Sequence, residues 1–229
     1  MKQRTKLVAA CALTLLFLLF LVLVKTVDVA AIGPNETTVG FSALNGAVRD
    51  GIGVHMGWYK LTEVLGILAI LVAAGFGVLG LLQLITRKSL FKVDAQILTA
   101  GVLYLVVILL YVLFEKAIVN YRPIIMPGET EPEASFPSSH TMLTFVVMGS
   151  VTVLLKKYIQ NPTLLFVLRT VCGVILVLTV IGRLVSGVHW LTDILGGVIL
   201  SAALLMWFSY GLKPMKKLTK QMTKSQQKR

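Results

Sequence analysis

The chain has 229 residues, of which 56% are hydrophobic and 14% are charged, and its formal net charge at pH 7 is +12. A water-soluble domain normally carries about 25% charged residues, so this composition excludes an ordinary soluble protein and predicts an integral membrane protein. The basic residues lie beside apolar segments and in the tail at 213–229, with no nucleic-acid motif among them, which argues against nucleic acid as a partner. Both cysteines, Cys11 and Cys172, lie inside apolar segments, so neither a disulfide framework nor a thiolate metal site is indicated.

The first predicted element is an apolar run at 7–24, which follows three basic residues and is long enough to cross the hydrocarbon core as a helix. A cleaved signal peptide is the alternative, but the apolar region of such a peptide is usually shorter, so an uncleaved anchor is expected. Residues 26–60 then form a polar connection, and the amphipathic part at 41–59 is expected to lie in the membrane interface.

Five further apolar segments are long enough to be membrane-spanning helices, and short charged or proline-rich links separate them. They lie at 61–85, 95–114, 140–155, 164–181 and 191–212. The expected fold class is therefore all-α, an integral membrane bundle of six transmembrane helices, with residues 1–229 forming a single domain. No internal repeat or separate soluble domain is visible in the sequence.

The distribution of basic residues predicts how the bundle is oriented in the membrane, because loops rich in lysine and arginine stay on the cytoplasmic side. Basic residues lie before the first span, between the second and third spans, and after the fourth span, so these segments are expected to be cytoplasmic. They are Lys2, Arg4, Lys6, Arg87, Lys88, Lys92, Lys156 and Lys157. With six spans, the basic tail at 213–229 returns to the same side. Both termini are thus expected in the cytoplasm, and the loop at 127–135 and the turn at 183–189 are expected on the outer face.

The turn at 183–189 and the start of the sixth span place three polar residues in an apolar region, where charged groups are expected to have a function. The i to i+4 spacing puts Asp193 on the same helical face as His189, where it is expected to take a hydrogen bond from the imidazole and orient it. Arg183 offers a planar set of donors that suits a tetrahedral oxyanion. A structural ion pair between Arg183 and Asp193 is the alternative reading.

Two other motifs face the same side of the membrane. Ser138 is expected to be the N-cap of the fourth span, where free backbone amides make a phosphate cradle, and His140 in the first helical turn is placed to act as an acid. Lys116 and Arg122 follow the third span and add two cationic donors. Together these residues fit a phosphate monoester. Two carboxylates near the helix ends, Glu63 and Glu115, are expected to be interfacial residues, and an ion pair with a motif arginine is the alternative for Glu115.

These motifs resemble those of the type 2 phosphatidic acid phosphatase superfamily, whose pattern is Lys-x6-Arg-Pro, then Pro-Ser-Gly-His, then Ser-Arg-x5-His-x3-Asp. The second and third motifs match in spacing, with Ser139 in place of the family's glycine and Gly182 in place of its serine. The first motif departs from the pattern. Only five residues separate Lys116 from Arg122, so the family's lysine position falls on Glu115.

The resemblance implies a mechanism. His189 would attack phosphorus and form a phosphohistidine, Asp193 would orient His189, and His140 would protonate the leaving oxygen. Neither a metal nor another cofactor is implied. The resemblance assigns the phosphate oxygens to five further residues, namely Lys116, Arg122, Ser138, the backbone amide of Ser139, and Arg183.

The implied function is that of a lipid phosphatase in the bacterial cell membrane, with its active site on the outer face. Within the bacterial branch of the family, the favoured reaction is dephosphorylation of phosphatidylglycerol phosphate to phosphatidylglycerol. The alternatives are undecaprenyl pyrophosphate, which serves cell-wall carrier recycling, and a broad range of lipid phosphates. The expected partners are a phospholipid or polyprenyl phosphate substrate and the bilayer, with no nucleic acid and no obligate protein partner. A noncatalytic lipid-binding or lipid-transporting protein is the alternative from another class.

Overall fold

The computed structural model describes residues 1–212, and the predicted tail at 213–229 lies outside the described residues. The described part contains seven α-helices: α1 (Gln3–Thr26), α2 (Ser42–Ile52), α3 (Met56–Arg87), α4 (Ala95–Lys116), α5 (Ser139–Tyr158), α6 (Pro162–Val185) and α7 (Leu191–Gly211). Two short 3-10 helices, η1 (Pro34–Glu36) and η2 (Leu90–Lys92), lie in the links. Two strands, β1 (Ala30–Ala31) and β2 (Thr38–Val39), form a small antiparallel sheet that pairs Ala30 with Val39 and Ala31 with Thr38.

Every α-helix of the described part except α2 is long and apolar enough to cross a membrane. This confirms the predicted all-α bundle with six spans. The second span is longer than predicted, because α3 has 32 residues and begins at Met56 instead of residue 61. At about 1.5 Å per residue α3 is about 48 Å long, so it extends beyond a hydrocarbon core of about 30 Å. Its first turns carry Trp58 and Tyr59, which are typical of the membrane interface and lie outside the apolar run.

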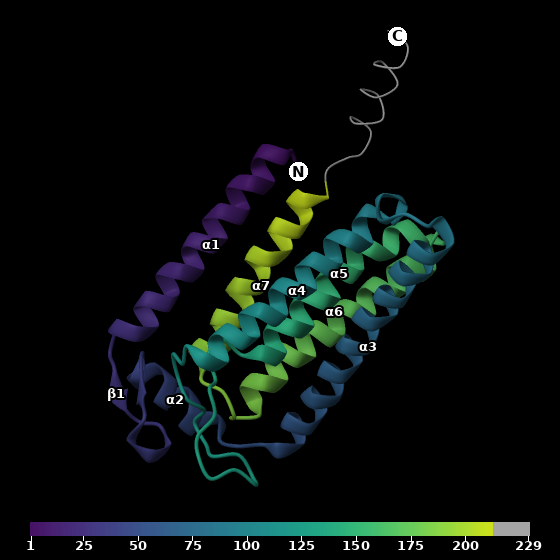
Figure 1. Cartoon of the computed structure of the whole chain (residues 1–229). Helices are drawn as coiled ribbons and strands as arrows, with labels where there is room; N and C mark the ends of the chain where they lie inside the picture. Colours follow the sequence, from purple (N-terminus) through teal and green to yellow (C-terminus); the bar gives the residue numbers. More distant parts are fainter. Residues whose placement is uncertain (213–229) are drawn as a thin grey trace, which may run out of the picture.

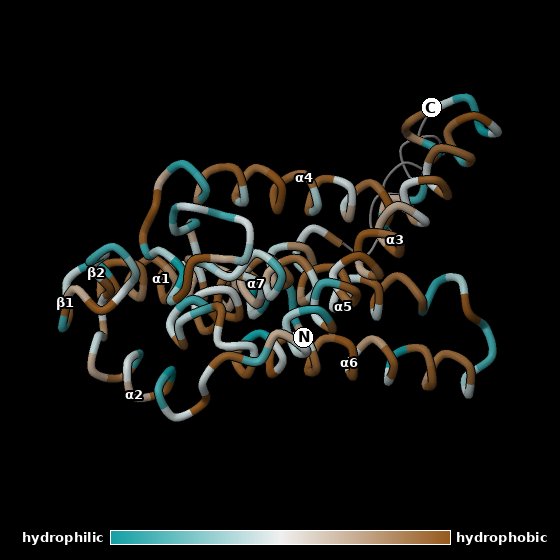
Figure 2. Tube along the Cα trace, turned by 90° about the horizontal axis from the view of Figure 1, so that it is seen from below, coloured by the Kyte–Doolittle hydropathy of each residue, from teal (hydrophilic) through white to brown (hydrophobic). Residues whose placement is uncertain are grey.

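Helices α5 and α7 form the centre of the bundle. In their spans 50% and 56% of the residues are buried, compared with 11% in α3 and in α6. Helix α7 packs between α1 and α5, and α5 also packs against α6 (Figure 1). The outer helices are mostly brown in Figure 2, whereas teal residues gather in the connecting segments. The exposed leucine, valine and isoleucine side chains of the outer helices form the apolar surface that a bilayer would cover.

Different segments of the chain lie at the two ends of the bundle. The start of α1 lies beside the end of α7, where Lys6 Nζ donates a hydrogen bond to the carbonyl oxygen of Ser209 at 2.8 Å. At the opposite end lie β1, α2 and the connection between α4 and α5 (Figure 1). Helix α2 is fixed there by Asn45, which is buried and hydrogen-bonded to both the hydroxyl and the backbone amide of Thr192 at the start of α7.

Asp94 joins three helices at the end of the bundle that holds the start of α1 and the end of α7. Its carboxylate pairs with Arg87 at 3.1 Å and with Lys157 at 2.8 Å, and it accepts a hydrogen bond from Tyr158 at 2.7 Å. Burial on its own would raise the pKa of Asp94, but hydrogen bonds from Lys157, Tyr158 and Arg87 outweigh it and hold this pKa well below its usual range. Asp94 is therefore ionised at neutral pH and ties α3, α4 and α5 together.

Candidate phosphate site

The connection between α4 and α5 is folded back on itself and carries Arg122 to the centre of the bundle end. The amide of Arg122 donates to the carbonyl of Glu133, and the amide of Ser135 donates to the carbonyl of Asn120, both at 2.9 Å. The indole of Trp190, just before α7, donates to the carbonyl of Tyr121 at 2.7 Å. These bonds place Arg122 and the start of α5 beside the turn that holds His189.

His189 lies between α6 and α7, and only 5% of its surface is exposed. Its Nδ1 is 3.6 Å from Oδ2 of Asp193, which is the predicted pairing at a separation longer than a hydrogen bond. Catalytic contacts are often long before a substrate binds. Burial lowers the pKa of His189 well below its ordinary value, and the charges of Arg122 and Arg183 lower it further. The imidazole is therefore neutral at pH 7, which a nucleophile requires.

Asp193 is fully buried and is held from two sides. Its Oδ2 accepts a hydrogen bond from the backbone amide of Trp190 at 2.9 Å, and its Oδ1 accepts one from Nδ2 of Asn120 at 3.1 Å. Asn120 is itself 2% exposed and was not singled out in the sequence. Because both oxygens have fixed partners, the carboxylate keeps its orientation toward His189.

Arg183 pairs with Glu63 and not with Asp193, so the alternative of a structural Arg183–Asp193 ion pair does not describe this fold. Nη2 of Arg183 lies 2.5 Å from Oε1 of Glu63, and Nε2 of His140 lies 3.1 Å from the same oxygen. The expectation that Glu63 is an interfacial residue stays a prediction, but the sequence did not indicate its two cationic partners. Helix α3, which carries Glu63, passes beside the site. The Glu63 carboxylate therefore contacts cationic partners on α5 and α6.

Small residues allow α3 to approach the site closely. A Cβ atom on Gly66 would lie 2.8 Å from Cδ2 of His140, so the imidazole packs against the backbone of α3. Two turns earlier, the ring of Tyr59 stacks on the guanidinium of Arg183, with 5.0 Å between the guanidinium carbon and the ring centroid. Tyr59, Glu63 and Gly66 share one face of α3, since they are spaced by four and three residues.

Several polar atoms at the site are buried and have no hydrogen-bond partner within residues 1–212. They are Oγ of Ser138, Nδ1 of His140, Nε and Nη1 of Arg183, and both ring nitrogens of His189. An unpartnered buried polar atom is unfavourable by about 1–3 kcal/mol, so such a group of donors is unusual unless a polar ligand completes it.

Ser138 occupies the N-cap position of α5 as predicted, but its side chain makes no capping hydrogen bond. Its backbone amide donates to the carbonyl of Asp193 at 3.0 Å, which joins the second motif to the third. The hydroxyl is left free for another partner. Ser139 begins the helix, where a backbone amide has no carbonyl acceptor within the helix, so this amide is also placed for an anion.

The comparisons with known proteins agree with this arrangement. The sequence pattern of the PAP2 superfamily matches residues 69–216, well over half of the chain. This chain belongs to the PAP2 superfamily. Phosphatidylglycerophosphatase B of Bacillus subtilis (strain 168) is 34% identical over 104 residues, which make up 44% of this chain and 49% of that protein. The alignment with this curated relative thus spans about half of its length.

A solved structure of a PAP2 protein has a similar fold. It is described as the first transmembrane PAP2 type phosphatidylglycerolphosphate phosphatase from Bacillus subtilis, and it matches 88% of this chain and 94% of its own with a TM-score of 0.59. The sequence identity is 23%. At this identity the match supports the architecture of the bundle and says nothing of the substrate.

The structure accounts for one departure from the PAP2 pattern. Gly182 stands where the pattern has serine, and a Cβ atom there would lie 2.6 Å from Cγ2 of Thr62 and 3.2 Å from Cε3 of Trp58. Both of these side chains belong to α3. The glycine is therefore the point at which α3 packs closely on α6, immediately before Arg183.

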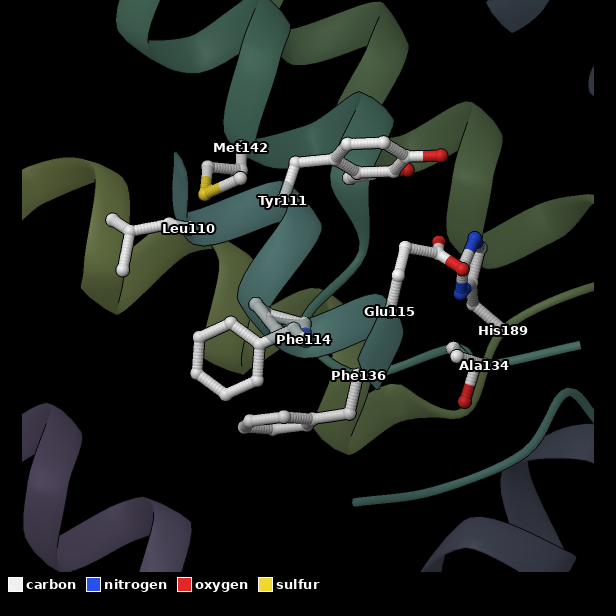
Figure 3. A pocket seen from close by; sticks show the side chains of 11 residues that line it. Leu110, Tyr111, Phe114, Glu115, Ala134, Phe136, Met142 and His189 are labelled. Atoms are coloured by element: carbon white, nitrogen blue, oxygen red, sulfur yellow. The ribbon is translucent and has the colours of Figure 1, made fainter. Parts of the chain in front are cut away.

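The first PAP2 motif departs further. Lys116 is exposed and has no ion pair or hydrogen bond to a described side chain, so the phosphate contact predicted for it stays a prediction. Glu115, at the lysine position of the pattern, lines a small pocket of about 10 Å³ with His189 and Ser139. In Figure 3, Glu115 and His189 lie on one side of this pocket, and Leu110 and Met142 lie on the other.

An apolar cavity of about 470 Å³ adjoins that pocket between α3, α4 and α5. Tyr111, Ser139 and Met142 line both the pocket and the cavity. His140 lies at the polar end of the cavity, and the remaining wall is mostly aliphatic, formed by residues such as Ile70, Val107 and Val147. The polar site of this PAP2 protein thus opens onto a space that suits a hydrocarbon chain.

Proposed function

We propose that this PAP2 protein is an integral membrane lipid phosphatase that acts through a phosphohistidine intermediate, with residues 1–229 forming one membrane domain. One observation carries the proposal. The buried polar atoms of Ser138, His140, Arg183 and His189, which lack partners among the described residues, gather where the apolar cavity begins. A phosphate group would satisfy those atoms, and the hydrocarbon chain of the same lipid would fill the cavity.

The attacking atom in this proposal is Nε2 of His189, because Nδ1 faces Asp193. Nε2 forms a bond to phosphorus while the bond from phosphorus to the ester oxygen breaks, and His140 gives its proton to that leaving oxygen. Asp193 stabilises the positive charge that develops on the His189 ring. Water then attacks phosphorus, His140 takes the proton that the water loses, and the bond from phosphorus to Nε2 breaks, which releases phosphate and regenerates His189.

Arg122, Arg183, Ser138, the amide of Ser139 and Lys116 are the proposed ligands of the phosphate oxygens. Donors that are fixed before the reaction stabilise the negative charge of the transition state without reorganisation, and each contributes on the order of 3 kcal/mol. Arg122 is held in place by Glu133, whose Oε2 lies 2.8 Å from Nε of the arginine. Arg183 is held by Glu63.

Phosphatidylglycerol phosphate is the proposed substrate, since the curated relative is named a phosphatidylglycerophosphatase. Undecaprenyl pyrophosphate and a broad range of lipid phosphates are the alternatives, because the same polar donors fit any of their phosphate groups. The proposed location is the bacterial cell membrane, and the proposed partners are the lipid substrate and the bilayer.

The test is phosphate release by the purified protein in detergent containing EDTA. Phosphatidylglycerol phosphate, undecaprenyl pyrophosphate and phosphatidic acid are compared, each with the wild type, His189→Ala and His55→Ala. His55 is an exposed histidine whose side chain hydrogen-bonds, among the described residues, only to the carbonyl of Ile52, so it serves as the matched control.

The expected result is release from phosphatidylglycerol phosphate by the wild type and by His55→Ala, and none above background by His189→Ala. The ranking of the three lipids identifies the substrate. If the folded wild type releases phosphate from none of them, the enzyme proposal fails and the noncatalytic lipid-binding or lipid-transporting alternative takes its place.

A further inference from the structure

Glu63 makes a contact that none of the three motifs contains. A single oxygen of its carboxylate lies within hydrogen-bond distance of Nε2 of His140 and of Nη2 of Arg183. These partners are the proposed general acid and a proposed phosphate ligand, and they come from α5 and α6, whereas Glu63 comes from α3. The carboxylate therefore links the group that protonates the leaving oxygen to the group that holds the phosphate.

The contacts of Glu63 leave room for the phosphate. Arg183 uses Nη2 for Glu63, and its Nε and Nη1 have no partner within residues 1–212. Each of these two atoms keeps an N–H that is available to a phosphate oxygen. His140 likewise uses Nε2 for Glu63 and keeps Nδ1 without a partner in the described chain. Glu63 thus occupies other atoms than those left for the substrate, so phosphate can bind without displacing it.

A general acid has to carry its proton before the bond to phosphorus breaks. The guanidinium of Arg183 shares the Glu63 oxygen with His140, and a positive charge so close disfavours a second one on the imidazole. Glu63 is the carboxylate that contacts the ring, and its negative charge acts in the opposite direction. Its side chain is 35% exposed, so the contact is not simply a buried ion pair that stabilises the fold.

We propose that Glu63 is a positioning residue that keeps His140 in its protonated form, with Nδ1–H directed to the leaving oxygen. During the reaction the proton moves from Nδ1 of His140 to the ester oxygen as its bond to phosphorus breaks. His140 then becomes a neutral imidazole that still contacts the Glu63 carboxylate. This inference rests on the proposed function.

The test compares two phosphate esters that differ in their need for a general acid. An alkyl lipid phosphate has a poor leaving group that must be protonated, whereas p-nitrophenyl phosphate releases a stable phenolate. The ratio kcat/KM covers the steps up to formation of the phosphoenzyme and is measured for both esters with the purified full-length protein. Glu63→Gln keeps the size of the side chain and removes its charge.

Glu63→Gln is expected to lower kcat/KM for the lipid phosphate by about tenfold to a hundredfold, which is part of the usual contribution of a general acid. For p-nitrophenyl phosphate the expected change is within about twofold, because that leaving group bypasses the acid. Inhibition by vanadate, which imitates the pentacoordinate phosphoryl state, should be as strong as in the wild type or stronger, because a negative charge has been removed beside the anion.

The matched control is Glu133→Gln, which removes the carboxylate beside the other phosphate arginine, Arg122, without touching a histidine. It should change kcat/KM by the same factor for both esters. Glu63→Asp keeps the charge, and its ratio of the two kcat/KM values should stay close to the wild-type ratio. This second variant also decides the question if Glu63→Gln does not fold.

Equal losses on both esters in Glu63→Gln would show a structural role and overturn the inference, as would no loss on either. In both cases an active wild type that His189→Ala inactivates leaves the proposed function intact. A wild type that cleaves neither ester overturns the proposed function and this inference with it.

Discussion

Buried side chains at the bundle end are positioned by partners that are distant in the sequence. Asn120 and Asp193 are 73 residues apart, and Arg183 and Glu63 are 120 residues apart. Asp193, Arg183 and His140 therefore each depend on a neighbour outside their own motif. Polar groups in such a setting are sensitive to loss of one partner, because the remaining partner is left buried and unpaired.

Asn120→Ala tests this dependence at Asp193. The substitution removes the 3.1 Å hydrogen bond to Oδ1 and lets the carboxylate turn away from His189. A lost buried hydrogen bond is unfavourable by about 1–3 kcal/mol, so kcat for the lipid phosphate should fall by about tenfold or more. The phosphate ligands are untouched, and KM should therefore change little. Steady-state kinetics on the purified variant measure both values.

Asn35→Ala is the control for Asn120→Ala, because Asn35 is an asparagine at the same end of the bundle that contacts only the exposed Glu131. Its kcat should equal that of the wild type. An unchanged kcat in a folded Asn120→Ala protein would mean that Asn120 does not position the carboxylate.

Among the helices, α3 contributes more to the site than its lack of a family motif suggests. One face of its first half carries Tyr59, Thr62, Glu63 and Gly66, which contact the residues of the second and third motifs or their immediate neighbours. The helix can approach because Gly182 and Gly66 have no side chains at the points of contact. The position of Glu63 therefore depends on how α3 packs.

Gly182→Ser tests the packing of α3 on α6. The variant restores the residue of the PAP2 pattern, but its Cβ would lie 2.6 Å from Thr62, so α3 must shift. Overpacking of this kind is usually unfavourable by about 1–3 kcal/mol, and the Tm should fall measurably in a thermal unfolding assay in detergent. The lipid phosphatase activity should fall as well, since Glu63 moves with α3.

Gly173→Ser is the matched control, because Gly173 lies on the same helix, α6, and a Cβ there meets no atom within 4 Å. Its Tm and activity should match those of the wild type. Equal effects of the two serine substitutions would indicate a general response of α6 and not the contact with α3.

At the scale of the whole molecule, the site lies at one end of the bundle and the start of α1 and the end of α7 lie at the other (Figure 1). The basic residues of the α3–α4 link and of the end of α5 lie at the same end of the bundle as the start of α1. From the positive-inside rule we propose that the site lies on the outer face of the membrane.

Cysteine labelling tests the orientation. In a background with Cys11→Ser and Cys172→Ser, single cysteines are introduced by Glu131→Cys and Lys156→Cys, both at exposed positions. A membrane-impermeant maleimide applied to intact bacterial cells should label E131C, which lies at the site end. It should label K156C only after the membrane is permeabilised. The reverse pattern would place the site in the cytoplasm.

Local sequence features were sufficient to predict the six spans, and they also led to the proposed site residues. A run of about 20 apolar residues can be identified as a membrane span from its length and composition alone. The i to i+4 spacing of His189 and Asp193 likewise brings these two residues to one face of a chain segment. The same features did not mark the start of α3 at Met56, because its first turns are aromatic and polar although they are helical. The start of α3 is therefore visible only in the backbone conformation of the folded chain.

Glu63 and Asn120 required the tertiary structure. The sequence offered one signal for Glu63, a carboxylate near the start of an apolar span, but this signal equally fits an interfacial residue. Its partners lie on α5 and α6, and its contact with them depends on the close approach of α3 at Gly66 and Gly182. Motif spacing describes residues that are near one another in the chain. Contacts between residues 73 or 120 positions apart are determined by helix packing, which no local pattern specifies.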